Sequence, residues 1–234
     1  MRVLTSDNPR IVNGQTVDDA QLNELYAFPD GGCLRTNFVA TLDGAAAGPD
    51  GRSGSINNAV DKAVFDLNRR LADVVVAGVT TMDIERYHPS AGDTPLVTLS
   101  GRCRIPRGWW QHPIQPGMAI MATTTDADPV ELDRARELLG PDSVWTLGAG
   151  LVDLAALRAR LEGMGLRKIL CEGGPRVHAD LLRRGLLDEA ALTWTPTMVG
   201  GPAPRIVDGD VVDVRFRLRS LLESDATLLG LWAR

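Results

Sequence analysis

Glycines, hydroxyls and one carboxylate cluster directly after three apolar runs of the sequence. The turn at 171–178 reads CEGGPRVH, and the turns at 77–82 and 99–102 read AGVTTM and LSGR. Glycines let a backbone approach a phosphate closely, and the free N–H groups at a helix start attract an anion. Two such helix starts in one sheet suit a pyrophosphate. Ser100 and Arg102 could hold an additional phosphate, such as the 2′-phosphate of NADP.

The glycine turns match neither of the two common nucleotide-binding fingerprints. None reads G-x-G-x-x-G or G-x-x-x-x-G-K-[ST], so a plain strand-to-helix connection is the alternative at each turn. Glu172 is a candidate to orient a substrate or relay a proton, because a closed cleft can raise the pKa of a carboxylate. Asp43 in the stretch TLDG is a second candidate, with the holding of its own turn as the alternative role.

Apolar runs and helical patterns alternate from residue 34 to residue 184. This predicts an α/β fold with a mainly parallel sheet and helices on both faces, closed by an antiparallel strand pair within 214–234. Residues 1–32 precede the pattern as an N-terminal arm, and residues 33–234 form a single domain. Ligands of such sheets bind beyond the carboxyl ends of the strands. The predicted strands are 34–41, 72–78, 95–100, 118–124, 143–148, 167–174 and 188–196, and helices begin near 58, 79, 128, 153 and 175.

Composition excludes several classes of protein. The chain has 234 residues and a net charge of −5, and it has no basic stripe, which argues against nucleic acid as a partner. No apolar run approaches the roughly 18 residues that a membrane span requires. Cys33, Cys103 and Cys171 lie far apart without a C-x-x-C pair, so neither a disulfide framework nor a metal site is expected. We therefore expect a reduced, cytoplasmic protein.

The combined pattern resembles the pyrimidine reductase family of riboflavin biosynthesis. NFVATLDG at 37–44, ADVVVAG at 72–78 and EGGPRVHADLL at 172–182 follow one another at the spacing of that family. The resemblance implies a dihydrofolate reductase-like fold, a three-layer sandwich, with NADPH as the cofactor. It also implies that hydride reaches C1 of an open-chain sugar, which converts a ribosylamino-pyrimidine 5′-phosphate into the ribitylamino compound.

The resemblance also implies a role for each matching residue. Catalytic roles fall to Glu172 and, as the second candidate, to Asp43. Substrate contacts fall to Asn37, Ser53 and Arg69, with Arg69 directed at the substrate phosphate. The turn from Gly174 wraps the pyrophosphate. The expected cofactor-binding residues are Val39, Ala40, Gly78, Thr80, Thr81, Glu85, Ser100, Arg102, Gly173, Gly174, Pro175, Arg176 and Val177.

Several positions depart from the family pattern. Asn37 stands where many members have lysine, Ser55 stands where they have tryptophan, and the arginine expected after the segment 81–85 is missing. Arg69 lies about 180° from the apolar stripe of its helix. A solvated surface arginine is therefore the alternative to a phosphate-binding role. Two alternatives therefore stay open. One is a pterin or folate reductase of the same fold, which needs no phosphate arginine, and the other is a nucleotide-binding protein without turnover.

The C-terminal stretch favours self-association. Apolar and charged residues alternate from Val214, and the chain ends in LLGLWAR. These residues predict strands with apolar side chains that a single domain does not obviously cover. Exposed apolar surfaces of this kind often mark association sites, and twofold dimers are the commonest assembly. We therefore expect a homodimer that binds a small phosphorylated pyrimidine.

Overall fold

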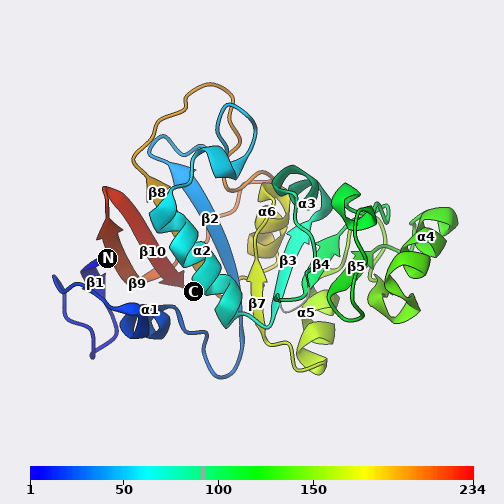
Figure 1. The fold of residues 1–234 in the computed structure, drawn as a ribbon, viewed down its shortest axis with the longest axis horizontal. Coiled ribbons are helices and arrows are strands. Elements are labelled where there is room, and N and C mark those ends of the chain that lie inside the picture. The colour runs from blue at the N-terminus through cyan, green and yellow to red at the C-terminus, as the bar shows by residue number, and fades with distance from the viewer. Residues whose placement is uncertain (91–92) are drawn as a thin grey trace.

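A single sheet runs through the residues that the computed structural model describes, 1–90 and 93–234 (Figure 1). Its strands are Arg2–Ser6 (β1), Cys33–Thr41 (β2), Val74–Gly78 (β3), Leu96–Leu99 (β4), Ala119–Thr123 (β5), Val144–Thr146 (β6), Lys168–Cys171 (β7), Glu189–Thr195 (β8), Arg217–Ser224 (β9) and Thr227–Ala233 (β10). They follow the order β1-β9-β10-β8-β2-β7-β3-β4-β5-β6 across the sheet.

Pairing in the sheet is parallel from β8 through β2, β7, β3, β4 and β5 to β6. It is antiparallel between β8, β10, β9 and β1. The predicted parallel sheet with an antiparallel closing pair is thus confirmed. Strands β3 and β5 carry the continuous apolar runs of strands that are buried on both faces. Pairing of β9 begins at Arg217, although the alternation in the sequence begins at Val214.

Short polar side chains set where several helices begin. The side chain of Asn58 accepts hydrogen bonds from the backbone N–H groups of Val60 and Asp61, at the predicted start of a helix near residue 58. Asp128 and Asp153 cap two later helices in the same way. None of the helices in the described residues is long and apolar enough to cross a membrane. The α-helices are Asp19–Tyr26 (α1), Ala59–Leu71 (α2), Val79–Glu85 (α3), Pro129–Leu139 (α4), Leu154–Gly163 (α5) and Pro175–Arg183 (α6).

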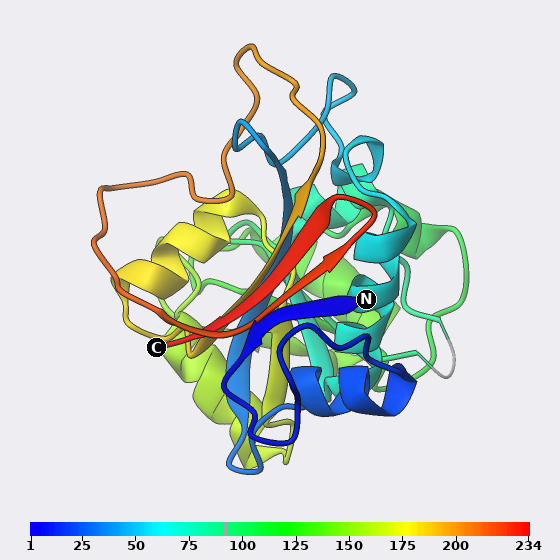
Figure 2. The same cartoon turned by 90° about the vertical axis from the view of Figure 1, so that its left-hand side faces the viewer.

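The helices form one layer on each face of the sheet (Figure 2). Helices α5 and α6 bury one face through a cluster that includes Leu154, Leu157, Leu161, Leu181, Val76 and Ile169. On the other face α3 and α4 pack through Met82, Ala135 and Leu139 against Val75 and Met121. Helix α2 packs there through its apolar stripe, Val60, Val64 and Leu67, against Leu229 and Leu231. These layers confirm the predicted three-layer sandwich.

Strand β2 leaves one of its neighbours halfway along its length. It pairs with β7 only as far as Thr36, which lies opposite Cys171, but it pairs with β8 as far as Thr41, opposite Thr195. From Asn37 onward, β2 therefore has a single partner. The sheet opens at this point, directly beyond the carboxyl end of β7.

The first 32 residues contribute elements of their own. Strand β1 pairs with β9 at the edge of the sheet, and Val3, Leu25 and Tyr26 are buried with residues of α2 and β10. The backbone carbonyl of Tyr26 also accepts a hydrogen bond from the Arg35 side chain. The segment expected as an arm is thus packed against the sheet, and the division of the chain at residue 33 stays a prediction.

A buried arginine joins this segment to the sheet and to α2. The side chain of Arg35 is fully buried, and its Nε and Nη2 lie 2.9 and 2.6 Å from Glu189 Oε2. Its Nη1 donates to Asn68 Oδ1 at 2.9 Å. A buried charge of this kind is stable only while its partners remain in place.

We predict that Arg35→Met lowers the free energy of unfolding by about 3–5 kcal/mol, because it leaves Glu189 buried without its main partner. Urea denaturation of both proteins measures the change. Arg2→Met serves as the matched control, since it removes only a partly exposed pair with Glu223 and should change stability by less than about 1 kcal/mol. Equal losses in the two variants would contradict this account.

Candidate active site

A cleft of about 670 Å³ lies where β2 separates from β7. Its walls come from the second half of β2, the loop after it, α2, the β3–α3 connection and the turn between β7 and α6. The cleft therefore brings together segments that are far apart in the sequence. The predicted residues that line it are Asn37, Val39, Ser53, Gly78, Thr80, Thr81, Glu85, Glu172, Gly174, Pro175, Arg176 and Val177.

The glycine turn before α6 is packed too closely for side chains. Gly173 has φ +93°, and a Cβ atom there would lie 2.9 Å from Cζ of Phe38. A Cβ atom on Gly174 would lie 2.8 Å from Oγ1 of Thr81. The backbone N–H of Gly78 donates to the Gly173 carbonyl at 2.8 Å, which joins the two predicted phosphate turns. Since α6 begins without a side-chain cap, its first N–H groups are suited to an anion.

Glu172 is held in one orientation by Arg69. Nε and Nη2 of Arg69 lie 2.8 and 2.7 Å from the two carboxylate oxygens, a bidentate arrangement. The Glu172 side chain is only 2% exposed, yet it lines the cleft. The guanidinium carbon of Arg69 lies 4.5 Å from the ring centroid of Phe65 and 4.4 Å from that of Tyr87. Arg69 is therefore not a solvated arginine, and two of its donors bind Glu172 rather than a phosphate.

Tyr87 adds a hydroxyl beside this pair. Burial raises the pKa of Tyr87 well above its usual value, and the negative charge of Glu172 adds to the effect. Burial alone would lower the pKa of Arg69, but its bonds to Glu172 raise it. The phenol thus stays protonated and the guanidinium stays charged. Tyr87 was not predicted as a site residue, because no periodic pattern in the sequence indicates that a residue after α3 lies near the turn before α6.

Helix α2 contributes residues to the cleft that were not predicted from the sequence. Asp61, Lys62 and Phe65 line it, whereas the predicted Arg69 does not, and Asp61 is buried. Asp61, Phe65 and Arg69 follow one another at intervals of four residues, so they form one stripe along the helix. That spacing was the signal by which Asp61 and Phe65 could have been found from the sequence.

Glu85 connects the cofactor side of the cleft to the loop after β2. Its carboxylate Oε1 accepts the backbone N–H of Ser53 at 3.0 Å, and both residues line the cleft. The sequence analysis assigned Glu85 to the cofactor and Ser53 to the substrate. The contact brings these two predicted residues together and fixes the position of the loop.

Asp43 lies outside the cleft, on the exposed turn after β2. Its carboxylate accepts hydrogen bonds from the Thr41 hydroxyl and from the backbone N–H groups of Val199 and Gly200, the last at 2.7 Å. These bonds, with that from Thr41 the strongest, lower the pKa of Asp43. A carboxylate held ionised on an exposed turn is unsuited to donate a proton in the cleft, so the geometry favours the turn-holding role.

Besides Asp43, and Arg69 that bonds to the cleft residue Glu172, four predicted residues do not line the cleft: Ala40, Ser100, Arg102 and Gly173. The side chain of Ala40 points to the opposite side of its strand from that of Val39, because side chains alternate along a strand. Ser100 is buried, and its hydroxyl accepts the backbone N–H of Arg104 at 2.8 Å. Arg102 is exposed. These residues can reach a ligand only through backbone atoms or from beyond the rim of the cleft.

His178 supports the cleft from behind. Its ring stacks on Phe38 at a centroid distance of 4.7 Å, and Nδ1 lies 3.0 Å from the carbonyl oxygen of Ile206. A carbonyl only accepts, so Nδ1 carries the proton. Burial lowers the pKa of His178 to about 4. The imidazole is therefore neutral near pH 7 and holds the position of Phe38, a cleft residue.

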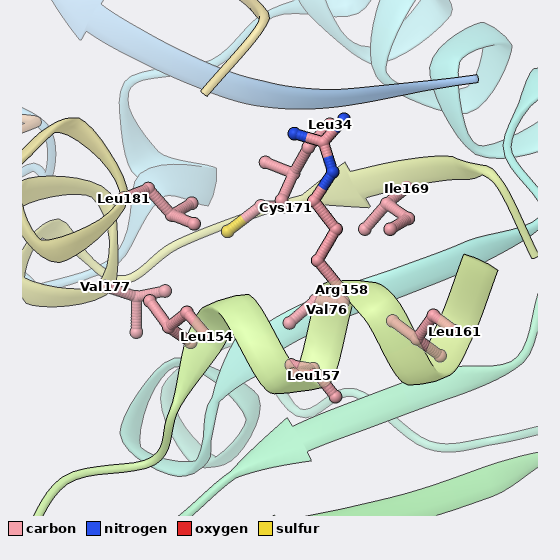
Figure 3. A pocket seen from close by; sticks show the side chains of 10 residues that line it. All are labelled: Leu34, Val76, Leu154, Leu157, Arg158, Leu161, Ile169, Cys171, Val177 and Leu181. Carbon is pink, nitrogen blue, oxygen red and sulfur yellow. The ribbon is translucent and has the colours of Figure 1, made fainter. Parts of the chain in front are cut away.

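A second hollow lies between α5, α6 and the sheet (Figure 3). Its volume is about 10 Å³, and leucine, isoleucine and valine side chains make up most of its wall. In Figure 3 the guanidinium of Arg158 extends towards Leu34, and the sulfur of Cys171 points towards Leu181. An apolar gap near the size of a single water holds no ligand. This hollow belongs to the packed core.

The opened parallel sheet brings the glycine turn and the fixed carboxylate into one cleft, as expected of the predicted dihydrofolate reductase-like fold. Residues 33–229 match the RibD C-terminal domain family, and the chain belongs to that family. A 2,5-diamino-6-ribosylamino-4(3H)-pyrimidinone 5′-phosphate reductase from Methanothermobacter thermautotrophicus is 30% identical over 186 residues, 76% of this chain and 84% of the relative. The predicted pyrimidine reductase family is thus confirmed.

Solved structures show the same fold. A pyrimidine reductase-like protein from Corynebacterium diphtheriae superposes with a TM-score of 0.76 at 20% identity, over 91% of this chain and 98% of that one. A diaminohydroxyphosphoribosylaminopyrimidine deaminase/5-amino-6-(5-phosphoribosylamino)uracil reductase from Thermotoga maritima has a TM-score of 0.64 at 18% identity, over 86% of this chain and 56% of that one. These similarities confirm the predicted fold.

We predict that His178 makes the stability of the protein depend on pH. Its pKa is about 4 in the folded chain and about 6.5 in the unfolded chain, which therefore binds more protons between these values. The contribution is complete above about pH 6.5 and is lost as the pH falls towards about 4, by up to roughly 3 kcal/mol. Urea denaturation at several pH values measures it. His178→Gln should flatten the slope in this window, and an unchanged slope would contradict the assignment.

Proposed function

We propose that this chain uses NADPH to reduce a ribosylamino-pyrimidine 5′-phosphate to its ribitylamino product. The observation that carries the proposal is the Glu172 carboxylate, held by Arg69 in the cleft and directly before the glycine turn of α6. This arrangement places a polar anchor for a substrate beside a place for a pyrophosphate. The names of the relatives support the same chemistry, but they differ in the ring, a diaminopyrimidinone in one and a uracil in the other.

The residues present fit a dinucleotide cofactor. Gly173 and Gly174 pack against Phe38 and Thr81 and carry no side chains of their own, and the uncapped start of α6 lies beside Thr81. Gly174 through Val177, together with Gly78, Thr80 and Thr81, would hold the pyrophosphate. Val39 and the backbone at Ala40 would lie against the nicotinamide. When bound, the cofactor supplies the hydride.

The protein then has to orient the sugar and provide a path for one proton. Glu172 accepts hydrogen bonds from a sugar hydroxyl or relays the proton, while Arg69 keeps the carboxylate in place. Tyr87 stays protonated beside it and can donate. Asn37 and Ser53, which also line the cleft, complete the substrate contacts. In this proposal Arg69 acts through Glu172 and not on the phosphate.

One observation favours the second candidate function, a pterin or folate reductase. The arginine expected to bind the substrate phosphate is bound to Glu172 instead, and a pterin needs no phosphate site. An assay that offers dihydrofolate beside the pyrimidine phosphate separates the two functions. A protein that binds nucleotides without turnover would oxidise NADPH with neither compound.

We also propose a homodimer that forms through the sheet face opposite α2. Trp194, Leu228 and Trp232 are partly exposed there, and the two indole rings meet edge to face at 5.3 Å. Trp232 lies over Gly230, where a Cβ atom would approach its ring to 2.0 Å. Leu192 and Leu221 flank Gly230 in the register of β8 and β9. A continuous apolar row of this kind supports a twofold interface.

The three cysteines support a reducing compartment. Cys33, Cys103 and Cys171 are all buried and unpaired in the structure, and burial raises the pKa of the Cys171 thiol to about 12. A protonated thiol is a poor nucleophile and resists oxidation. We therefore propose the cytoplasm as the location of the protein.

We predict that Glu172→Gln lowers turnover of the pyrimidine phosphate about 10²–10⁴-fold, the usual span for a positioned acid or base. NADPH affinity should change little, because the cofactor meets the backbone from Gly174 onward. Single-turnover NADPH oxidation at several pH values, with dihydrofolate in parallel, measures both proteins. Glu137→Gln on the exposed face of α4 is the control. A Glu172→Gln rate within about threefold of the parent would remove Glu172 from the mechanism.

We predict that NADPH binds at least about tenfold more tightly than NADH. Arg102 is an exposed cation just beyond the end of β4, where a 2′-phosphate would gain charge-assisted hydrogen bonds. Calorimetry should show that Arg102→Ala reduces NADPH affinity towards that of NADH and leaves NADH affinity unchanged. Arg134→Ala on α4 should alter neither affinity. Equal binding of both cofactors by the parent protein would refute the preference.

A further inference from the structure

Asp61 is a buried carboxyl group in the cleft that the proposed reduction does not use. It lies in the first turn of α2, is 4% exposed and lines the cleft. The basic residues nearest to it on the helix, Lys62 and Arg69, form ion pairs with other carboxylates. In the described part of the chain, Asp61 itself forms no ion pair, and the Thr193 side chain of β8 lies close enough to lower the pKa of its carboxyl group. The carboxylate therefore has acceptor positions left for a ligand.

This environment favours a particular kind of ligand group. Burial raises the pKa of Asp61, and the hydrogen bond from Thr193 offsets part of that effect. An ionised carboxylate only accepts hydrogen bonds, and leaving it buried without donors is unfavourable. Two adjacent N–H donors on a flat ligand would satisfy both of its oxygens, as a guanidinium does. The group that suits Asp61 is thus a ring edge with two neighbouring N–H donors.

We propose that Asp61 binds the N3–H and 2-amino groups of a 2-amino-4-oxopyrimidine ring, and thereby selects the diamino substrate over its deaminated counterpart. The inference rests on the proposed function, because it specifies the ring of that same substrate. The diamino ring presents two donors side by side. The uracil ring presents N3–H next to a 2-oxo acceptor, which would face a carboxylate oxygen. Buried polar groups that lose a partner in this way reject the wrong ligand strongly.

The position of Asp61 suits the ring end of such a substrate. Thr193, its partner, pairs in the sheet with Val39, the residue proposed to lie against the nicotinamide. Asp61, Phe65 and Arg69 form a stripe along α2 over two turns, a rise of about 12 Å. A pyrimidine ring bound to Asp61 would contact the Phe65 side chain, and its sugar chain would extend towards Glu172, the carboxylate that Arg69 holds.

The proposal also implies an order for two reactions, the reduction of the sugar chain and the deamination of the ring. If the cleft requires the 2-amino group, the sugar chain is reduced before the ring is deaminated. The product keeps the 2-amino group, so a separate hydrolytic deamination has to consume it. A chain that accepted only the deaminated ring would act after that step.

The test compares two substrates, 2,5-diamino-6-ribosylamino-4(3H)-pyrimidinone 5′-phosphate and its deaminated uracil analogue. We expect the parent protein to favour the diamino ring in kcat/KM by about 10²-fold or more. Asp61→Asn offers one acceptor and one donor, which matches the uracil edge. In this variant, kcat/KM should fall at least about tenfold for the diamino substrate and rise for the uracil substrate. A misfolded protein cannot show such a rise. Asp133→Asn, at an exposed position of α4, should leave the ratio unchanged.

Several outcomes separate this proposal from the proposed function. Equal use of both rings by the parent, or an unchanged ratio in Asp61→Asn, overturns the role of Asp61 while the reductase function stands. If neither pyrimidine reacts and dihydrofolate does, the proposed function fails. The role of Asp61 is then tested with dihydrofolate, whose ring has the same 2-amino-4-oxo edge. A KM for dihydrofolate that is unchanged in Asp61→Asn overturns this role. Calorimetric binding of both pyrimidines to the complex with oxidised cofactor should show the same preference without turnover.

Discussion

The pairing of β2 determines where this protein can bind a ligand. Up to Thr36 the strand has two hydrogen-bonded neighbours, and beyond that point β8 alone continues beside it. The sheet therefore opens at the carboxyl end of β7, where the chain turns into α6. Because Phe38 occupies the space next to Gly173, side chains are excluded from the turn and its backbone stays accessible. The cleft, the glycine turn and the position of Glu172 all depend on this one separation.

Two buried carboxylates that line the cleft have different surroundings. Glu172 is bound by a guanidinium that stacks between two aromatic rings, so its charge is balanced by the protein itself. Asp61 has a threonine hydroxyl as its partner, and its charge is left for a ligand to balance. A cleft of this kind can hold one carboxylate in a fixed orientation and use the other to recognise a ring. The roles follow from the environment and not from the residue type.

Much of the fold and part of the site could be predicted from the sequence. The apolar runs of β3 and β5 and the cap at Asn58 have local causes, so their positions were predictable. The twelve predicted residues that line the cleft come mostly from strand ends and turns, which a parallel sheet brings to one edge. The contact between Arg69 and Glu172 joins residues 103 positions apart, and no local pattern specifies it. Tyr87 and the outward position of Asp43 likewise depend on tertiary contacts.

In the proposed function, this cleft transfers hydride from NADPH to the sugar carbon of a pyrimidine phosphate. The most direct measurement supplies NADPH that carries deuterium at C4, on each face in turn, and locates the label in the product by mass spectrometry and NMR. The account predicts a single deuterium on C1 of the ribityl chain with one of the two labelled cofactors and none with the other. A product without deuterium from either cofactor, or a substrate that is recovered unreduced, would contradict it.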